Sequence, residues 1–195
     1  KVAKAVKLPD GYKITWNGDF ENQKRASARL AQVVPISVLL IFVILYVLFG
    51  NARDAGLVLT NVPFAAVGGI LILLSTHTNF SISAGIGFIC LFGICIQNGV
   101  IMLMDIKHFL RHRYALPEAV TRGMHSRIRS VLMTAMMATL GLMPAALSHG
   151  IGSESQRPLA TVIIGGLVGA TLFTLFIFPL IVERIYSHVN IKKLR

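Results

Sequence analysis

Residues 82–104 read ISAGIGFICLFGICIQNGVIMLM, a run of 23 residues without a charged side chain. An α-helix rises about 1.5 Å per residue, so about 20 apolar residues cross the hydrocarbon core of a bilayer. Within that core every backbone donor must be satisfied inside the segment, which leaves the α-helix as the structure for such a run. This stretch therefore predicts a membrane-spanning helix.

Four further apolar runs accompany it, at residues 33–49, 55–74, 131–147 and 159–182. Of the 195 residues, 54% are hydrophobic and 14% are charged, and the mean hydropathy is +0.70. A soluble domain rarely combines these values, so most soluble enzymes and binding modules are excluded. Residues 31–195 are therefore predicted to form an all-α integral membrane domain with five transmembrane helices, and the two termini lie on opposite sides.

The connections between the runs differ in their basic residues. Residues 51–54, residues 105–130 and the C-terminal tail carry eleven Lys or Arg residues, whereas residues 75–80 and 148–157 carry only Arg157. The positive-inside rule therefore places the first set, and with it the C-terminus, in the cytoplasm. The net charge of +11 is thus read as a topology signal, and no nucleic-acid partner is expected.

Residues 1–30 are polar and have the character of the end of a water-exposed domain. Residues 12–16 (YKITW) alternate as in a β-strand, and residues 21–32 favour a helix that leads into the first span. One strand cannot bury a core alone, so the body of this domain is expected elsewhere. The chain begins at Lys1 without a signal-peptide pattern, and this segment is expected on the non-cytoplasmic side.

A short helix is predicted at about residues 117–127. Pro117 suits the first turn of a helix and Glu118 suits the positive end of its dipole. The basic residues that follow predict a position along the cytoplasmic interface. Within the spans, kinks or helix ends are predicted at Pro35, Pro63, Pro144 and Pro179.

Gln97 and Asn98 form the most polar pair inside any span. Two uncompensated amides cost several kcal/mol in hydrocarbon, so both are expected to face the bundle interior. They could fix helix packing or line a polar or proton pathway, and both interpretations stay open. Thr134, in the fourth span, is of a type that usually satisfies its own helix backbone. No Asp or Glu lies at the middle of a span, so a proton-carrying carboxylate must come from elsewhere.

Metal-binding and catalytic patterns are weak. His108 and His112 are four residues apart on one helical face, a spacing that can hold a metal, but the basic residues around them favour a cationic interfacial cap. Gly165 and Gly169 have the spacing that lets a neighbouring helix approach closely, which favours tight packing of the bundle. No residue is predicted to be catalytic.

Five phrases resemble heavy-metal efflux pumps of the resistance-nodulation-division (RND) superfamily, the cobalt-zinc-cadmium type. They are NGDFENQKRA at 17–26, NVPFA at 61–65 with Gly68-Gly69, GIGFI at 85–89 with NGV at 98–100, RIRSVLMT at 127–134, and QRPLAT at 156–161 with Gly165-Gly166. They follow one another in order over essentially the whole chain. By this resemblance the chain looks like spans eight to twelve of an RND-type bundle, preceded by a β-strand and helix at the edge of a periplasmic domain.

The resemblance implies a twelve-span pump of the bacterial inner membrane that works as a homotrimer with a periplasmic adaptor and an outer-membrane channel. In that family proton influx drives the export of divalent metal ions. The chain is then expected to be a component of a proton/metal antiporter, without enzymatic activity or a cofactor. Its partners would include spans one to seven and the periplasmic domains.

The resemblance also implies roles for single residues. Arg127 and Thr134 match an Arg and a Thr that take part in coupling in drug-export relatives, and Gln97 stands where those relatives have a Lys. Candidate proton-relay or coupling residues are Gln97, Asn98, Arg127 and Thr134. An aliphatic residue near Ile163 replaces a methionine of the copper branch, which favours zinc, cobalt, cadmium or nickel as the transported ion.

Two other interpretations remain. One is a fragment of a drug-export RND pump, which the phrase FENQ at 20–23 disfavours. The other is a stand-alone five-helix membrane subunit that serves assembly or interaction.

Overall fold

The computed structural model describes residues 19–76, 78, 80–148, 150 and 152–187. These residues form helices and short connections, with no strand among them. In chain order the elements are α2 (Asp19–Phe49), α3 (Ala52–Leu59), α4 (Asn61–Ser75), α5 (Ile82–Arg111), α6 (Leu116–Leu147), α7 (Ser153–Leu172), the π-helical turn η1 (Phe173–Ile177) and α8 (Phe178–Ser187). The strand predicted at 12–16 lies outside the described residues.

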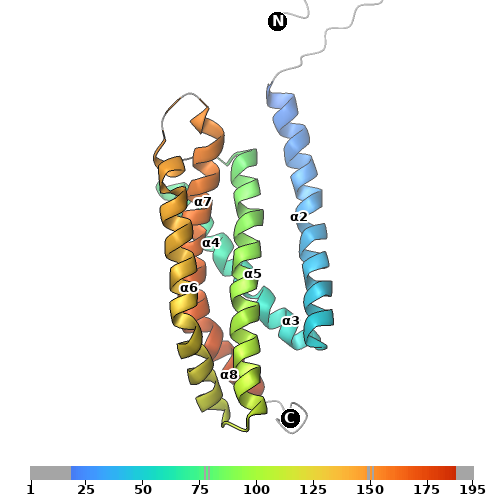
Figure 1. The fold of residues 1–195 in the computed structure, drawn as a ribbon. Coiled ribbons are helices and arrows are strands. Elements are labelled where there is room, and N and C mark those ends of the chain that lie inside the picture. The colour runs from blue at the N-terminus through green and yellow to red at the C-terminus, as the bar shows by residue number, and fades with distance from the viewer. Residues whose placement is uncertain (1–18, 77, 79, 149, 151, 188–195) are drawn as a thin grey trace, which may run out of the picture.

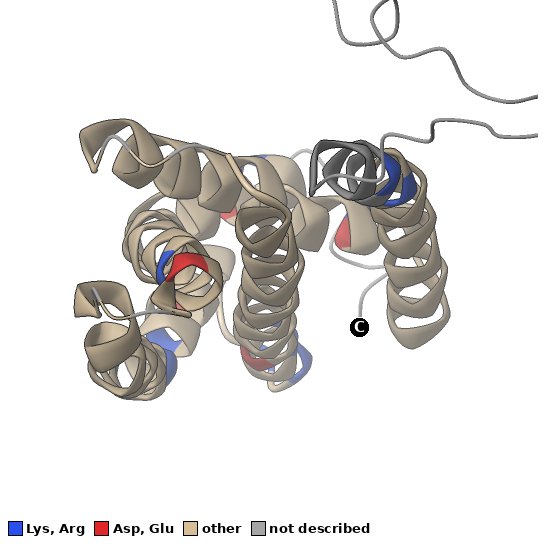
Figure 2. Cartoon of the chain, turned by 90° about the horizontal axis from the view of Figure 1, so that it is seen from above, with Lys and Arg blue, Asp and Glu red and all other residues tan. Residues whose placement is uncertain are grey.

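Five helical stretches are long and apolar enough to cross a membrane, which confirms the predicted number of spans. They are Ala28–Phe49, Ala52–Ser75, Ile82–Arg111, Leu116–Leu147 and Ser153–Ser187. The second stretch combines α3 and α4, and the fifth combines α7, η1 and α8. Seen from above, the charged residues occupy only small parts of the ribbons (Figure 2).

The spans form a bundle in which α7 contacts α4, α5 and α6. In Figure 1, α5, α6 and α7 stand side by side, while α3 and α4 run obliquely behind α5. The first span, α2, stands at one side and contacts the other spans through α3 and α5. The fifth span is therefore the centre of the packing within this chain.

The second span is interrupted between Leu59 and Asn61. Pro63 lies in the first turn of α4, where its missing N–H is tolerated. In a continuous helix the Pro63 ring would clash with the carbonyl of Leu59, four residues earlier. α3 therefore ends at Leu59, as the predicted helix end at Pro63 indicated.

The fifth span contains a turn with π-helical geometry, Phe173–Ile177, directly before α8. Pro179 follows this turn, and in a regular α-helix its ring would clash with the carbonyl of Leu175. The wider turn accommodates the proline without ending the span. Pro35 and Pro144, by contrast, lie inside α2 and α6.

The structure corrects the boundary of the predicted interfacial helix. Residues 117–127 and the span at 131–147 are one continuous helix, α6, with Pro117 in its first turn. No glycine, proline or other helix breaker stands between the two segments, so the helix propagates through them. Its 32 residues exceed the about 20 needed to cross the hydrocarbon, so one end of α6 projects beyond it.

Glycines line the contact between α4 and α7. A Cβ atom added at Gly68 would lie 2.9 Å from the Gly165 carbonyl oxygen and 3.2 Å from the Cα atoms of Gly166 and Gly169. A Cβ atom at Gly165 would lie 2.3 Å from Ile72 Cγ2. The two helix backbones approach this closely because none of these positions carries a side chain.

Candidate functional site

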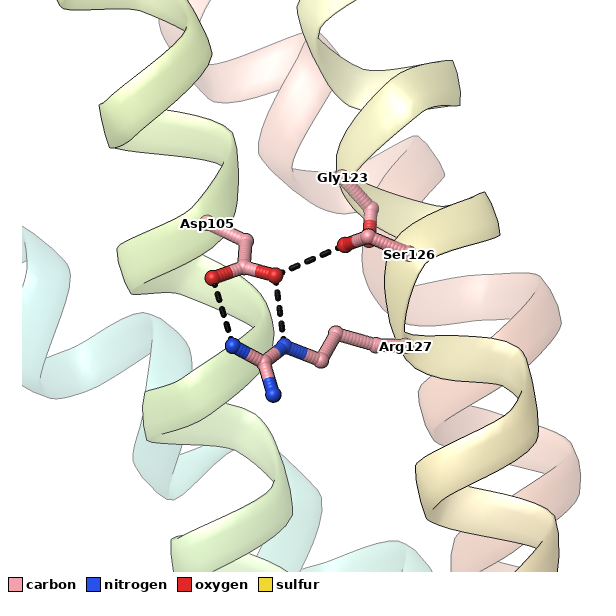
Figure 3. A network of polar contacts seen from close by, with 4 residues as sticks. All are labelled: Asp105, Gly123, Ser126 and Arg127. Atoms are coloured by element: carbon pink, nitrogen blue, oxygen red, sulfur yellow. Dashed lines mark hydrogen bonds and ion pairs between the residues drawn. The ribbon is translucent and has the colours of Figure 1, made fainter.

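The candidate site is a polar seam between α5 and α6. Arg127 on α6 donates two hydrogen bonds to Asp105 on α5, with Nε 2.5 Å from Oδ2 and Nη2 2.9 Å from Oδ1 (Figure 3). Ser126 Oγ donates to the same Oδ2 at 2.7 Å. Paired, charge-assisted bonds of this kind fix orientation as well as distance. The seam therefore sets the register of α5 against α6.

Gly123 makes this close approach possible. A Cβ atom at Gly123 would lie 2.7 Å from Ile106 Cγ1 and 3.2 Å from the Ile106 backbone. The Asp105 and Arg127 side chains are 21% and 34% exposed, so the pair lies at the edge of the bundle. Sequence reasoning identified Arg127 but not its partner, because the two residues meet only through the α5–α6 hairpin.

Asn98 and Thr134 extend the seam along both helices. Asn98 lies seven residues before Asp105, and Thr134 lies seven residues after Arg127. Seven residues make about two helical turns, so each residue shares a face with its counterpart in the ion pair, at about 10 Å along the helix. The four residues therefore follow two adjoining helix faces.

The predicted relay residues differ in their surroundings. Thr134 is exposed and donates to the Ser130 carbonyl at 2.9 Å, the local bond expected of a helical threonine. Asn98 is half-buried, and its side chain makes no hydrogen bond to the described residues. Gln97 is exposed and is likewise without a hydrogen bond within this part of the chain.

Gln97 lies on the outer surface of the bundle that these five spans form, and its expected place in a bundle interior stays a prediction. Cys95, Ile96 and Gly99 are the buried residues around it, so the Gln97 side chain points away from the packed face of α5. The sequence could not show which face of α5 packs against the other spans, because α5 carries apolar residues on all of its faces.

The two histidines that were weak candidates for a metal site lie next to each other at the end of α5. The His108 and His112 rings lie 4.4 Å apart between centroids, and His112 Nδ1 is 2.9 Å from the His108 carbonyl oxygen. No group of three or more His, Cys, Asp or Glu residues that could hold a metal ion occurs in the described part of the chain. Both side chains are exposed, in agreement with a cationic cap at the end of α5.

A second charged cluster, which sequence reasoning missed, joins three helices. The Asp54 side chain on α3 is 4% exposed and accepts hydrogen bonds from Lys107 Nζ at 2.6 Å and from Tyr186 Oη at 2.7 Å. Lys107 lies on α5 and Tyr186 on α8. A buried carboxylate is stable only when it is paired, and here both oxygens are engaged. This cluster therefore links α3, α5 and α8 at one end of the bundle.

Residues 1–185 match the model of the AcrB/AcrD/AcrF family. The cobalt-zinc-cadmium resistance protein CzcA of Cupriavidus metallidurans is 45% identical over 180 residues, which cover 92% of this chain and 17% of that protein. The nickel and cobalt resistance protein CnrA of the same organism is 46% identical over 179 residues, again covering 92% of this chain and 17% of that protein.

A solved structure also matches. The crystal structure of a heavy metal efflux pump, in its first crystal form, superposes with a TM-score of 0.76 at 42% identity, covering 95% of this chain and 18% of that one. The chain therefore spans less than a fifth of the length of the relatives it matches. Both kinds of match agree with the resemblance drawn from the sequence.

Proposed function

Because this chain belongs to the AcrB/AcrD/AcrF family, we propose that it forms spans eight to twelve of a heavy-metal RND efflux pump. The observation that carries the proposal is the continuous match to CzcA and CnrA over 92% of the chain. The names of these relatives include cobalt, zinc, cadmium and nickel, so the transported ion is a divalent cation of this group. Proton influx supplies the energy, and the proton-carrying carboxylates belong to spans outside this chain.

Within such a pump, the seam between α5 and α6 acts as the coupling surface. Gln97 and Thr134 are exposed on this chain, and Thr134 lies two turns from the Asp105–Arg127 pair. A polar residue in a span is costly against lipid, so these residues face other spans of the pump. The candidate coupling residues then respond to the charge of the proton-carrying carboxylates; they are Gln97, Asn98, Arg127 and Thr134.

The remaining assignments follow from the same premise. The pump lies in the bacterial inner membrane, and the eleven basic residues of one set of connections and the C-terminal tail support a cytoplasmic C-terminus. The segment before α2 is then periplasmic. A homotrimer with a periplasmic adaptor and an outer-membrane channel is the assembly in which these spans would work.

The proposal is tested in the full-length transporter that contains this chain, expressed in a metal-sensitive host. Thr134→Ala and Gln97→Leu should lower zinc and cobalt resistance while the protein level in the membrane stays near that of the parent. Thr121→Ala is the matched control, because Thr121 is also exposed on α6 and donates to the carbonyl four residues earlier, at 2.8 Å.

Parental resistance in both variants would contradict a part for Gln97 and Thr134 in coupling. A parent protein that confers no resistance to any divalent metal would contradict the pump itself.

A further inference from the structure

Two irregular segments, one in the second span and one in the fifth, are joined by a buried hydrogen bond. Thr174, in the π-helical turn, donates from Oγ1 to Oδ1 of Asn61 at 3.0 Å. Asn61 is the first residue of α4, directly after the break in the second span. Asn61 is 0% exposed and Thr174 is 1% exposed. The only places where these two spans depart from α-helical geometry are therefore in direct contact.

The Asn61 side chain also bridges the break in its own span. Its Nδ2 donates to the Val58 carbonyl in the last turn of α3 at 2.9 Å. The amide oxygen of Asn61 thus accepts a hydrogen bond from the fifth span, and the amide nitrogen donates one to the preceding helix, α3. Because Asn61 is bonded to both segments, a change in the angle between α3 and α4 shifts its side chain, which carries the acceptor of the Thr174 hydrogen bond.

Thr174 differs from the other helical threonines in how it uses its hydroxyl. Three of them, Thr121, Thr134 and Thr161, donate to the carbonyl four residues earlier in their own helix, and Thr60 and Thr76 do the same at the ends of α3 and α4. Such local bonds are available at any helical threonine. The Thr174 hydroxyl instead bonds to a residue 113 positions away in the sequence.

The third span, α5, packs closely against this contact because Gly99 carries no side chain. A Cβ atom at Gly99 of α5 would lie 2.6 Å from Asn61 Nδ2 and 3.3 Å from Val58 Cγ1. Beside the hydrogen bond, the rings of Phe64 and Phe173 stack with centroids 3.9 Å apart. The contact between α4 and η1 therefore has both a polar and an aromatic part, and α5 fits against it.

We propose that the Asn61–Thr174 hydrogen bond is a positioning contact that makes the second and fifth spans move as one body during transport. Separating them would leave a hydroxyl and an amide oxygen unpaired in an apolar interior, which costs more than the bond gains when formed. A change of angle at either irregular segment is therefore transmitted to the other. The inference rests on the proposed pump function, since it assigns the contact a part in the transport cycle.

The test uses the full-length transporter that contains this chain, reconstituted in proteoliposomes with Zn²⁺ as the transported ion. The double variant Asn61→Leu/Thr174→Val removes both polar partners of this bond while keeping similar side-chain shapes, so that of the groups involved only the Val58 carbonyl loses a donor and the protein should fold. Its maximal Zn²⁺ transport rate should fall about fivefold at an unchanged half-saturating Zn²⁺ concentration. Thr174→Ser keeps the hydroxyl and should retain the parental rate.

A second measurement follows the two spans directly, whether or not zinc is transported. Spin labels are attached at Val67→Cys on α4 and Leu180→Cys on α8, both exposed positions, with the native Cys90 and Cys95 replaced. The parent should give one narrow distance distribution, and the double variant should give a broader one.

The outcomes separate the two proposals. A double variant with the parental rate and the parental distance distribution would overturn the coupling. A parent that does not transport Zn²⁺ but whose distance distribution broadens in the double variant would contradict zinc transport while supporting the contact between the spans.

Discussion

The fourth and fifth spans are both apolar, yet they have opposite environments. In the most apolar stretch of the fifth span, 61% of the residues are buried within the chain, whereas in that of the fourth span 6% are buried. The first span resembles the fourth, also with 6% buried. The difference shows that hydropathy identifies a span but does not decide which spans lie at the centre of a bundle.

Residue size accounts for the difference. α7 presents Gly165, Gly166 and Gly169 to its neighbours, and these let α4 approach to backbone contact. α6 presents long side chains outward, including Met133, Met136 and Met137, which are 58%, 62% and 71% exposed. In lipid the hydrophobic effect does not drive helices together, so close packing at small residues decides the contacts.

The largest effect is expected at Asp54, which ties the end of the fifth span to the rest of the bundle. Asp54→Ala leaves the Lys107 ammonium and the Tyr186 hydroxyl without their acceptor in a mostly buried place. Breaking a buried pair in this way should cost about 3–5 kcal/mol of unfolding free energy. The measurement is the thermal unfolding midpoint of the purified transporter in detergent.

Asp54→Asn gives the matched comparison. It keeps an oxygen for Tyr186 but removes the charge that pairs with Lys107, so its midpoint should lie between those of Asp54→Ala and the parent. A parental midpoint for Asp54→Ala would mean that the buried end of the fifth span does not depend on this cluster.

A smaller effect is expected in the middle of the same span. Gly165→Ala places a Cβ atom 2.3 Å from Ile72 Cγ2 and 2.4 Å from Ile72 Cβ, so α4 must shift. Overpacking of this kind should cost about 1–3 kcal/mol. The unfolding midpoint of the transporter should therefore fall.

Gly141→Ala on the exposed fourth span is the control. Nothing lies within 4 Å of a Cβ atom at Gly141, and alanine is favoured over glycine in a helix by about 1 kcal/mol. Its midpoint should equal or exceed that of the parent. If both variants lost the same stability, small residues would not explain the contrast between the two spans.

The features of the five spans that depend on local chemistry were predictable from the sequence. Run length and hydropathy were sufficient for five spans, and Pro63 indicated the break in the second. The π-helical turn was not predictable, and neither were the contacts of Thr174 and Phe173, because their partners Asn61 and Phe64 belong to another span. Pro179 alone is compatible with a kink, a helix end or a wide turn.

The candidate site was predictable only one residue at a time. Arg127 and Thr134 were identified from their place in a motif, but the partner of Arg127 depends on how α6 lies against α5. Asp54 and Asp105 both stand near span ends in the sequence, where no pattern distinguishes them. The structure separates them, because Asp54 is held by two other helices whereas Asp105 pairs across one hairpin.

The smallest effect is expected on the exposed side of α6. Arg122 Nη2 lies 3.0 Å from Glu118 Oε1, one helical turn earlier, and the two side chains are 50% and 49% exposed. Solvent screens such a pair, and Arg122 also packs over the Tyr114 ring at 4.5 Å, a contact that does not need Glu118.

Glu118→Gln should therefore change the unfolding free energy by less than about 0.5 kcal/mol. The measurement is the unfolding midpoint at low and high salt, which should match the parent in both. A loss as large as that of Asp54→Asn would show that burial does not rank these two ion pairs, because the exposed Glu118–Arg122 pair would then contribute as much as the buried Asp54–Lys107 pair.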